Sequence, residues 1–185
     1  MINEALIRVL INRWEICEED IEVYKYGIKI LEKKILFILL YYAINIWCGN
    51  VMCGTITLIC FIIMRRNMGG LHLKNAHVCF IVSVISLMIC SAMARYNLVN
   101  DNVYRILYII ANIILIIIGP VDCENKRVCY EEKKYYYKMG IITMAIISMV
   151  LVFTVFMKWE EIEKSIEGSF ILIGASSCFA KLKHG

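Results

Sequence analysis

The chain alternates between long apolar stretches and short polar segments, and the apolar stretches are long enough to cross a membrane. Residues 35–64 contain no charged side chain. As one straight helix they would extend about 45 Å at about 1.5 Å per residue, whereas the hydrocarbon core of a bilayer is about 30 Å thick. We therefore predict two short or tilted spans, joined by a break at Cys48, Gly49, Asn50 and Gly54.

Further apolar stretches predict the other spans. They cover residues 78–94, 103–119, 139–157 and 168–180, so about six transmembrane helices are expected. Residues 4–14 carry apolar side chains at helical spacing between polar ones, which is typical of an amphipathic helix at the membrane surface. The pattern predicts an all-α integral membrane protein, with interfacial helices over residues 1–34 and a single six-span membrane domain over residues 35–185.

Lysine and arginine residues indicate how these spans are oriented. If both termini are cytoplasmic, all but four of the 20 basic residues lie in cytoplasmic segments; the exceptions are Arg95, Arg105, Lys158 and Lys164. The positive-inside rule favours this orientation over its inverse. Both termini are therefore predicted to be cytoplasmic. Because charges occur throughout the first 34 residues, we do not expect a signal peptide there.

Composition excludes several other classes of protein. With 61% hydrophobic residues and a mean hydropathy of +0.69, the chain is far too apolar for a water-soluble globule. Its net charge of +4 is small and confined to the predicted loops, so no nucleic acid is expected as a partner. Most of the nine cysteines sit singly in apolar stretches, unlike a secreted disulfide scaffold, and Cys123 and Cys129 lack the histidines of a zinc site. No metal or other cofactor is expected.

The segment 65–79 holds the residues with the clearest chemical potential. A cysteine attacks as its thiolate, and an imidazole can take the thiol proton and later protonate a leaving amine. His72 and Cys79 are the pair we select. Because seven residues of straight helix span about 10.5 Å, the segment must bend to bring the two side chains together. Gly69 and Gly70 permit a tight turn, and their N–H groups could face a developing oxyanion.

Each of these residues also has a simpler interpretation. Cys79 alone could be a small buried apolar residue, and His72 alone a solvated loop histidine. His77 competes as the base, although two residues from Cys79 it would point to the opposite side of a helix. Arg65 and Arg66 suit positive-inside anchors, and alternatively could guide an acidic peptide tail or bind a lipid headgroup.

The string R-R-x-x-G-G-x-H, followed seven residues later by cysteine, resembles the signature of the accessory gene regulator protein B family (AgrB). The members of that family are membrane cysteine endopeptidases that process quorum-sensing peptide precursors. The resemblance covers most of the chain. It includes the length, the charged amphipathic N-terminus, the six-span topology and the loop 119–127 with the basic, tyrosine-rich stretch that follows it.

The resemblance implies that His72 and Cys79 are catalytic, while Gly69, Gly70, Arg65 and Arg66 match the motif without an assigned role. It implies that Cys79 attacks a short AgrD-like precursor, releases its C-terminal tail and forms an acyl-enzyme. A thiol or hydroxyl of the bound peptide then closes a thiolactone or lactone ring. The site would face the cytoplasm of a multi-pass protein in a bacterial cell membrane. Asp122 or Asn75 could orient His72 if the fold brings them close.

Two other functions remain open from the sequence. In a small peptide transporter or channel, Arg65, Arg66 and Lys74 would attract a substrate and no bond would be broken. Ionisable residues at mid-depth would favour transport, but the predicted spans have none near their centres. A peptide-presenting membrane partner would not need Cys79. Besides the precursor peptide and the lipid bilayer, a second copy of the chain is a candidate partner, because short spans cover little of a peptide.

Overall fold

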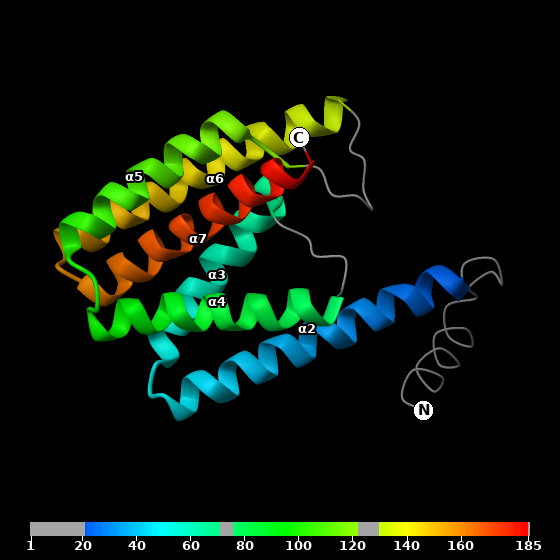
Figure 1. The fold of residues 1–185 in the computed structure, drawn as a ribbon, viewed down its shortest axis with the longest axis horizontal. Coiled ribbons are helices and arrows are strands. Elements are labelled where there is room, and N and C mark those ends of the chain that lie inside the picture. The colour runs from blue at the N-terminus through cyan, green and yellow to red at the C-terminus, as the bar shows by residue number, and fades with distance from the viewer. Residues whose placement is uncertain (1–20, 71–75, 122–129, 185) are drawn as a thin grey trace. The chain divides into compact units, whose positions relative to one another are not determined.

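The computed structural model describes residues 21–70, 76–121 and 130–184, and every regular element among them is a helix (Figure 1). The all-α prediction is therefore confirmed for these residues. The amphipathic helix predicted over residues 4–14 lies outside them. The helices are α2 (Ile21–Trp47), α3 (Val51–Met68), α4 (Ala76–Tyr96), α5 (Asp101–Ile118), α6 (Tyr130–Phe156) and α7 (Glu160–His184).

Four of the described helices are long and apolar enough to cross a membrane, namely α3, α4, α5 and α6. They correspond to four of the six predicted spans. Charged side chains interrupt α2 and α7, whose apolar segments 35–47 and 168–180 are shorter than the about 20 residues of a typical span. Membrane crossing by α2 and α7, and the location of the termini, stay predictions.

A turn interrupts the apolar stretch 35–64, as predicted, but it involves fewer residues than expected. Gly49 adopts a φ of +64° there, and the backbone N–H of Asn50 donates to the carbonyl of Asn45 at 2.8 Å. Gly54 lies inside α3, so its predicted part in the break is wrong. Its missing side chain instead makes room for Asn45, because a Cβ at this position would lie 2.4 Å from the Asn45 Oδ1.

The chain divides into two compact units, residues 1–44 and residues 45–185. The first unit contains most of α2, in which the charged residues Lys25, Lys29 and Lys33 precede the apolar segment. The second unit contains α3 to α7. It also carries the segment 65–79, so the candidate site belongs to this unit alone.

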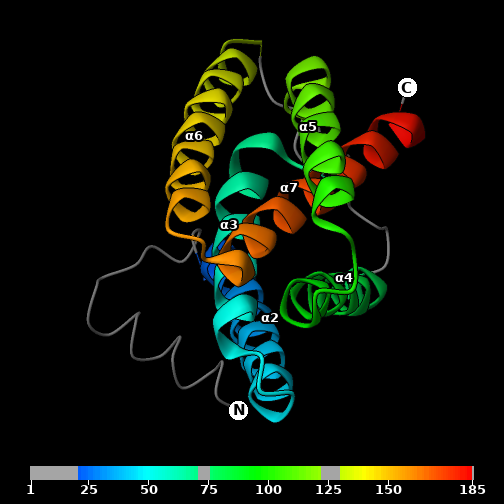
Figure 2. The same cartoon turned by 90° about the vertical axis from the view of Figure 1, so that its left-hand side faces the viewer.

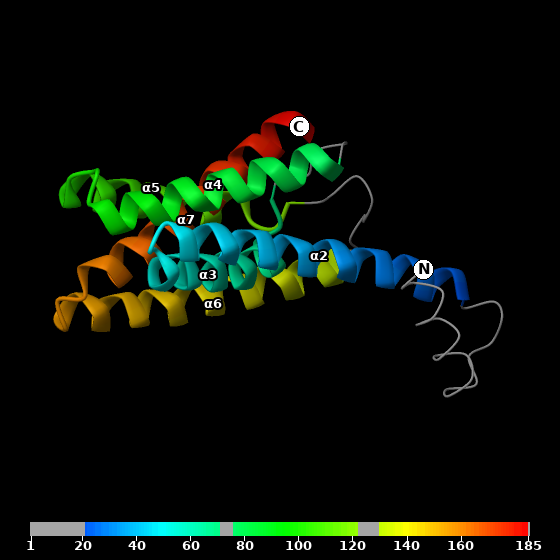
Figure 3. The ribbon, with the colours of Figure 1, turned by 90° about the horizontal axis from the view of Figure 1, so that it is seen from below.

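Within the second unit, α7 is the central helix and packs against α3, α4, α5 and α6. Figures 2 and 3 show α7 crossing the unit obliquely among these four helices. Residues 163–170 are all buried. A Cβ at Gly168 would lie 2.6 Å from the Cys90 Sγ, and one at Gly174 would lie 3.0 Å from the Ala111 Cβ. Small residues on α7 therefore permit the close backbone approach by which membrane helices associate.

Charged side chains meet at the end of the unit where α7 begins. Lys164 and Glu167 of α7 are only 3% and 2% exposed. Both precede the predicted span 168–180. Three of the four basic residues that the topology places on the outer side come together here. The ion pairs are Arg95 with Glu161, Arg105 with Glu163, and Lys164 with Asp101.

We predict that Gly174→Leu destabilises the unit by about 1–3 kcal/mol, because the added side chain overpacks the contact between α7 and Ala111 of α5. Gly27→Leu is the matched control, since a Cβ at Gly27 has no neighbour within 4 Å. The measurement is the unfolding temperature in detergent, followed with a fluorogenic maleimide that reacts with buried thiols such as Cys90 as they become exposed. Equal unfolding temperatures for the two variants would contradict the close packing of α7.

Candidate functional site

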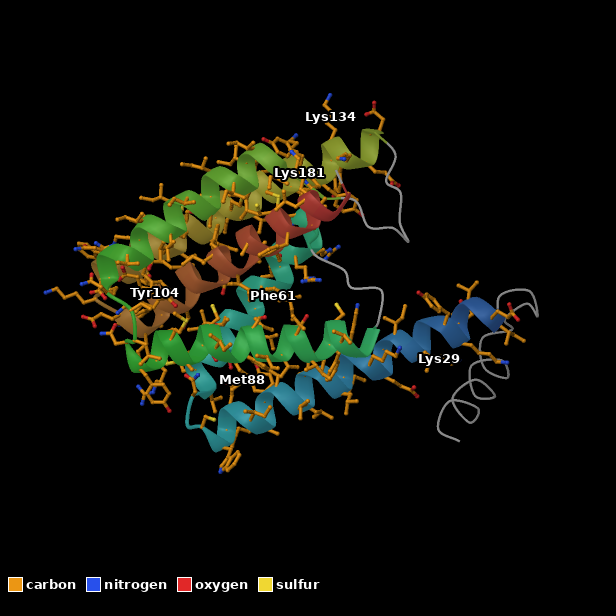
Figure 4. The ribbon with its side chains drawn as sticks, in the orientation of Figure 1. Lys29, Phe61, Met88, Tyr104, Lys134 and Lys181 are labelled. Carbon is orange, nitrogen blue, oxygen red and sulfur yellow. The ribbon has the colours of Figure 1, made fainter. Side chains whose placement is uncertain are left out.

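Cys79 lies in the first turn of α4 and lines a cavity of about 60 Å³ between three helices. The sulfur is a free, half-buried thiol. Phe61, labelled on α3 in Figure 4, belongs to the opposite wall. The lining comprises Cys79, Val82, Ser83 and Ser86 of α4, together with two residues each from α3 and α7: Phe61 and Arg65, and Leu172 and Ser176.

The α4 wall follows from helical spacing. Ser83 and Ser86 are four and seven residues beyond Cys79, so all three lie on one face of the helix. Because α4 packs against both α3 and α7, this face is directed to the interior of the unit. The thiol therefore stands at one end of a row that continues into two hydroxyl groups.

Arg65 and Arg66 separate in the structure. Arg65 lies in the last turn of α3, lines the cavity, and holds its guanidinium carbon 5.3 Å from the centroid of the Phe61 ring. This is a cation–π contact, which limits the directions the guanidinium can take. Arg66 is exposed and does not line the cavity, because consecutive helical residues point about 100° apart. Only Arg65 is thus placed beside Cys79.

The glycine pair ends α3 next to the same cavity. Gly69 has a φ of +72° and Gly70 a φ of +148°, backbone conformations that other residues rarely adopt. The Gly69 N–H donates to the Arg65 carbonyl at 3.0 Å and so caps the helix. A Cβ at Gly70 would lie 3.1 Å from the Ser176 Oγ and 3.6 Å from the Arg65 Nη1. Gly70 therefore lies against two residues of the cavity wall.

The start of the predicted loop 119–127 is hydrogen-bonded to the end of α3. After α5 ends, the backbone N–H of Val121 donates to the carbonyl of Met68 at 3.1 Å. A Cβ at Gly69 would lie 2.6 Å from the Val121 carbonyl oxygen. The close contact thus requires a glycine at position 69. This contact brings Val121, the residue that precedes Asp122, next to the segment 65–79.

Several predicted site residues lie outside the part of the chain that the structure describes. The positions of His72, Asn75 and Asp122 are not described, and neither is the side chain of His77. The pairing of His72 with Cys79 and the orienting role of Asn75 or Asp122 stay predictions. The structure does bring together Arg65, Gly70 and Cys79.

Sequence reasoning missed the greater part of the cavity wall. The i, i+4, i+7 spacing of Cys79, Ser83 and Ser86 could have identified the α4 contribution. Nothing local marks Leu172 and Ser176, which are distant in sequence and reach the site only because α7 packs against α3 and α4. The α7 contribution therefore required the tertiary structure.

Among the described residues, the polar groups of the cavity wall are one thiol, three serine hydroxyls and one guanidinium. A thiol can attack a carbonyl carbon, hydroxyls donate and accept hydrogen bonds, and a guanidinium attracts an anionic group. Within residues 21–70, 76–121 and 130–184, no three His, Cys, Asp or Glu side chains are grouped to hold a metal ion. The described groups thus include a nucleophile and groups that can bind a carbonyl oxygen or an anion.

Comparison with known proteins identifies similar sequences. The family model described as Accessory gene regulator B matches residues 4–180. A protein of Clostridium acetobutylicum that is named as AgrB-like is 28% identical to this chain over 135 residues. That match covers 69% of this chain and 65% of the Clostridium protein, which is less than two thirds of its length. No solved structure matches the chain.

We predict that Gly69→Ala lowers stability by more than the about 1–3 kcal/mol that its backbone conformation alone costs, because its Cβ also collides with the Val121 carbonyl. Gly49→Ala is the matched control, since Gly49 has a similar φ of +64° but no neighbour within 4 Å of its Cβ. Unfolding temperatures in detergent compare the two variants. Equal losses of stability would show that the contact with Val121 does not constrain position 69.

Proposed function

Because the chain belongs to the accessory gene regulator B family, we propose that it is a membrane cysteine endopeptidase that processes a short AgrD-like precursor in quorum sensing. The observation that supports this proposal most directly is the position of Cys79. Its thiol lines a cavity whose wall also contains the guanidinium of Arg65 and is contacted by Gly70. A nucleophile, a cationic group and a glycine backbone turn thus share one site.

In the proposed reaction, the Cys79 sulfur attacks the carbonyl carbon at the junction between the pheromone portion and the C-terminal tail. His72 accepts the thiol proton. When the tetrahedral intermediate collapses, the C–N bond breaks and the imidazolium returns that proton to the leaving amine of the tail. The pheromone portion is then a thioester on Cys79.

Ring closure consumes the thioester. A thiol or hydroxyl within the bound peptide gives its proton to His72 and attacks the thioester carbonyl. The C–S bond to Cys79 then breaks, and the imidazolium returns the proton to the Cys79 sulfur. The product is a thiolactone or a lactone. Because exchange between two thiols is nearly balanced in free energy, closure depends on holding the internal nucleophile close and keeping water away.

The residues around Cys79 take supporting roles in this proposal. The Gly69 N–H already caps α3, so the Gly70 N–H is the donor of the pair that we assign to the developing oxyanion. Arg65 attracts the negative charge of an acidic tail, and the exposed Arg66 is assigned to anchoring at the membrane surface. Asp122 or Asn75 would orient His72.

The membrane arrangement is part of the same proposal. We propose that α2 and α7 join the four apolar helices to make six spans in a bacterial cell membrane. The excess of basic residues in the predicted cytoplasmic segments supports placing both termini and the site on that side. A homodimer would enlarge the surface available to a peptide.

One observation favours the transport alternative. Lys164 and Glu167 are buried, and buried ionisable residues in membrane proteins often mark transport pathways. However, Lys164 pairs with Asp101, and the neighbouring Arg105 pairs with Glu163, at the end of the unit where α7 begins. Paired charges at a helix end also suit a structural connection between helices. We therefore keep the peptidase as the principal proposal.

We predict that Cys79→Ala abolishes processing, with a loss of at least about 10³-fold, because the nucleophile is removed. The protein is co-expressed with the short precursor encoded beside its gene, and the peptide masses are measured. Wild type should release a C-terminally shortened peptide one water lighter than the linear hydrolysis product. Cys178→Ala, a half-buried cysteine of α7 outside the cavity, is the control and should retain activity. The same product from Cys79→Ala would exclude the proposed mechanism.

We further predict that His72→Ala reduces cleavage by at least about 10²-fold, because general acid–base catalysis contributes about 10²–10⁴-fold. His77→Ala is the control and should have a mild effect. Single-turnover cleavage of the same precursor compares the two variants. The opposite ranking would assign the base to His77.

A further inference from the structure

The cavity beside Cys79 has two levels. We call the end formed by Arg65, Cys79 and Ser176 its mouth, because it lies where α3 ends and α4 begins. A Cβ at Gly70, which follows the end of α3, would lie 3.1 Å from the Ser176 Oγ and 3.6 Å from the Arg65 Nη1. Each of the three helices then contributes a residue one turn further into the unit. These deeper residues are Phe61 of α3, Ser83 of α4 and Leu172 of α7.

The two levels differ in polarity. The mouth has a guanidinium, a thiol and a hydroxyl, whereas Phe61, Val82 and Leu172 make the rest of the wall largely apolar, with two hydroxyls from Ser83 and Ser86. Among the residues that the structure describes, no acidic side chain lines the cavity. A positively charged group entering it would meet Arg65 and would lose its hydration without gaining a counter-charge. The wall therefore suits an uncharged side chain.

The volume limits the size of that side chain. The cavity measures about 60 Å³. A cavity of about 150 Å³ accommodates benzene, so an aromatic ring would not fit without displacement of the wall. Side chains the size of alanine, serine, cysteine, threonine or valine match the available space.

A substrate carbonyl attacked by Cys79 must present its own side chain next to the sulfur, because the Cα is bonded directly to the carbonyl carbon. Cys79 lines this cavity, which therefore offers a space for that side chain within the described part of the protein. We infer that the cavity is a specificity pocket for the residue whose carbonyl Cys79 attacks, and that it selects a small, uncharged side chain. This inference rests on the proposed function.

The test uses the precursor encoded beside the gene, after its cleavage site has been located from the product masses. The last residue of the pheromone portion is replaced in turn by Ala, Val, Phe and Lys, and kcat/KM is measured in detergent for each precursor. Wild type should cleave the Ala and Val precursors at least about tenfold better than the Phe and Lys precursors. The natural residue at this position should also be small and uncharged.

Two enzyme variants change the pocket in opposite directions. Leu172→Ala enlarges its deeper level and should raise kcat/KM for the Phe precursor relative to the Ala precursor by at least about tenfold. Ser83→Leu fills the pocket and should reduce cleavage of the Val precursor more than that of a Gly precursor. Leu182→Ala, an exposed leucine of the same helix, is the matched control and should leave the ranking unchanged. Unfolding temperatures show that each variant is folded.

The outcomes separate the pocket from the peptidase activity. Cleavage by Cys79→Ala would overturn the proposed function itself. If Cys79→Ala is inactive but wild type cleaves all four precursors equally well, the pocket proposal fails and the peptidase proposal stands. An unchanged ranking in both Leu172→Ala and Ser83→Leu, with both variants folded, would likewise overturn the pocket.

Discussion

The packing of α7 against four other helices is the constraint on which the second unit depends. Within a bilayer, water supplies no hydrophobic driving force between helices, so close contact and polar pairing must hold them together. Gly168 and Gly174 provide the close contact with α4 and α5. Ion pairs made by Glu161, Glu163 and Lys164 tie the start of α7 to α4 and α5. Further along, the same helix delivers Leu172 and Ser176 to the wall beside Cys79, so the central helix links the stability of the unit to the shape of the site.

Local hydropathy predicted the parts of the fold that depend on local composition. The apolar lengths of α3 to α6 and the turn at Gly49 are visible in the sequence, because apolar length and a positive φ are properties of a short segment. Gly54 was misleading, since a glycine that breaks a helix and one that admits a neighbouring Asn45 look alike in sequence. The burial of α7 could not be predicted from its charges either. Two of its carboxylates, Glu161 and Glu163, pair with arginines that come from α4 and α5.

The candidate site likewise has parts that could be predicted from the sequence and parts that could not. Cys79, Arg65 and the glycine pair were predicted because they belong to one short segment with a recognisable spacing, and the structure places Arg65, Gly70 and Cys79 around one cavity. Arg66 was grouped with Arg65 by adjacency, although neighbouring helical residues face different directions. The deeper wall at Phe61 and Leu172 could not be foreseen, because it requires knowing which faces of α3 and α7 meet α4. The partners proposed for Cys79 in acid–base chemistry lie outside the described residues.

The attachment of Val121 to the end of α3 bears on how an acyl-enzyme would be protected. Its N–H bond to the Met68 carbonyl holds the start of the loop 119–127 against Gly69, the residue before the Gly70 that adjoins the cavity mouth. A thioester at Cys79 reacts either with water, which gives the linear peptide, or with the internal nucleophile, which gives the ring. The ratio of the two products depends on which nucleophile reaches the carbonyl more often. A substrate side chain that fills a cavity of about 60 Å³ leaves little room for water next to the sulfur. The pocket that selects the residue would therefore also protect the intermediate, so a poorly fitting residue should favour the linear product over the ring.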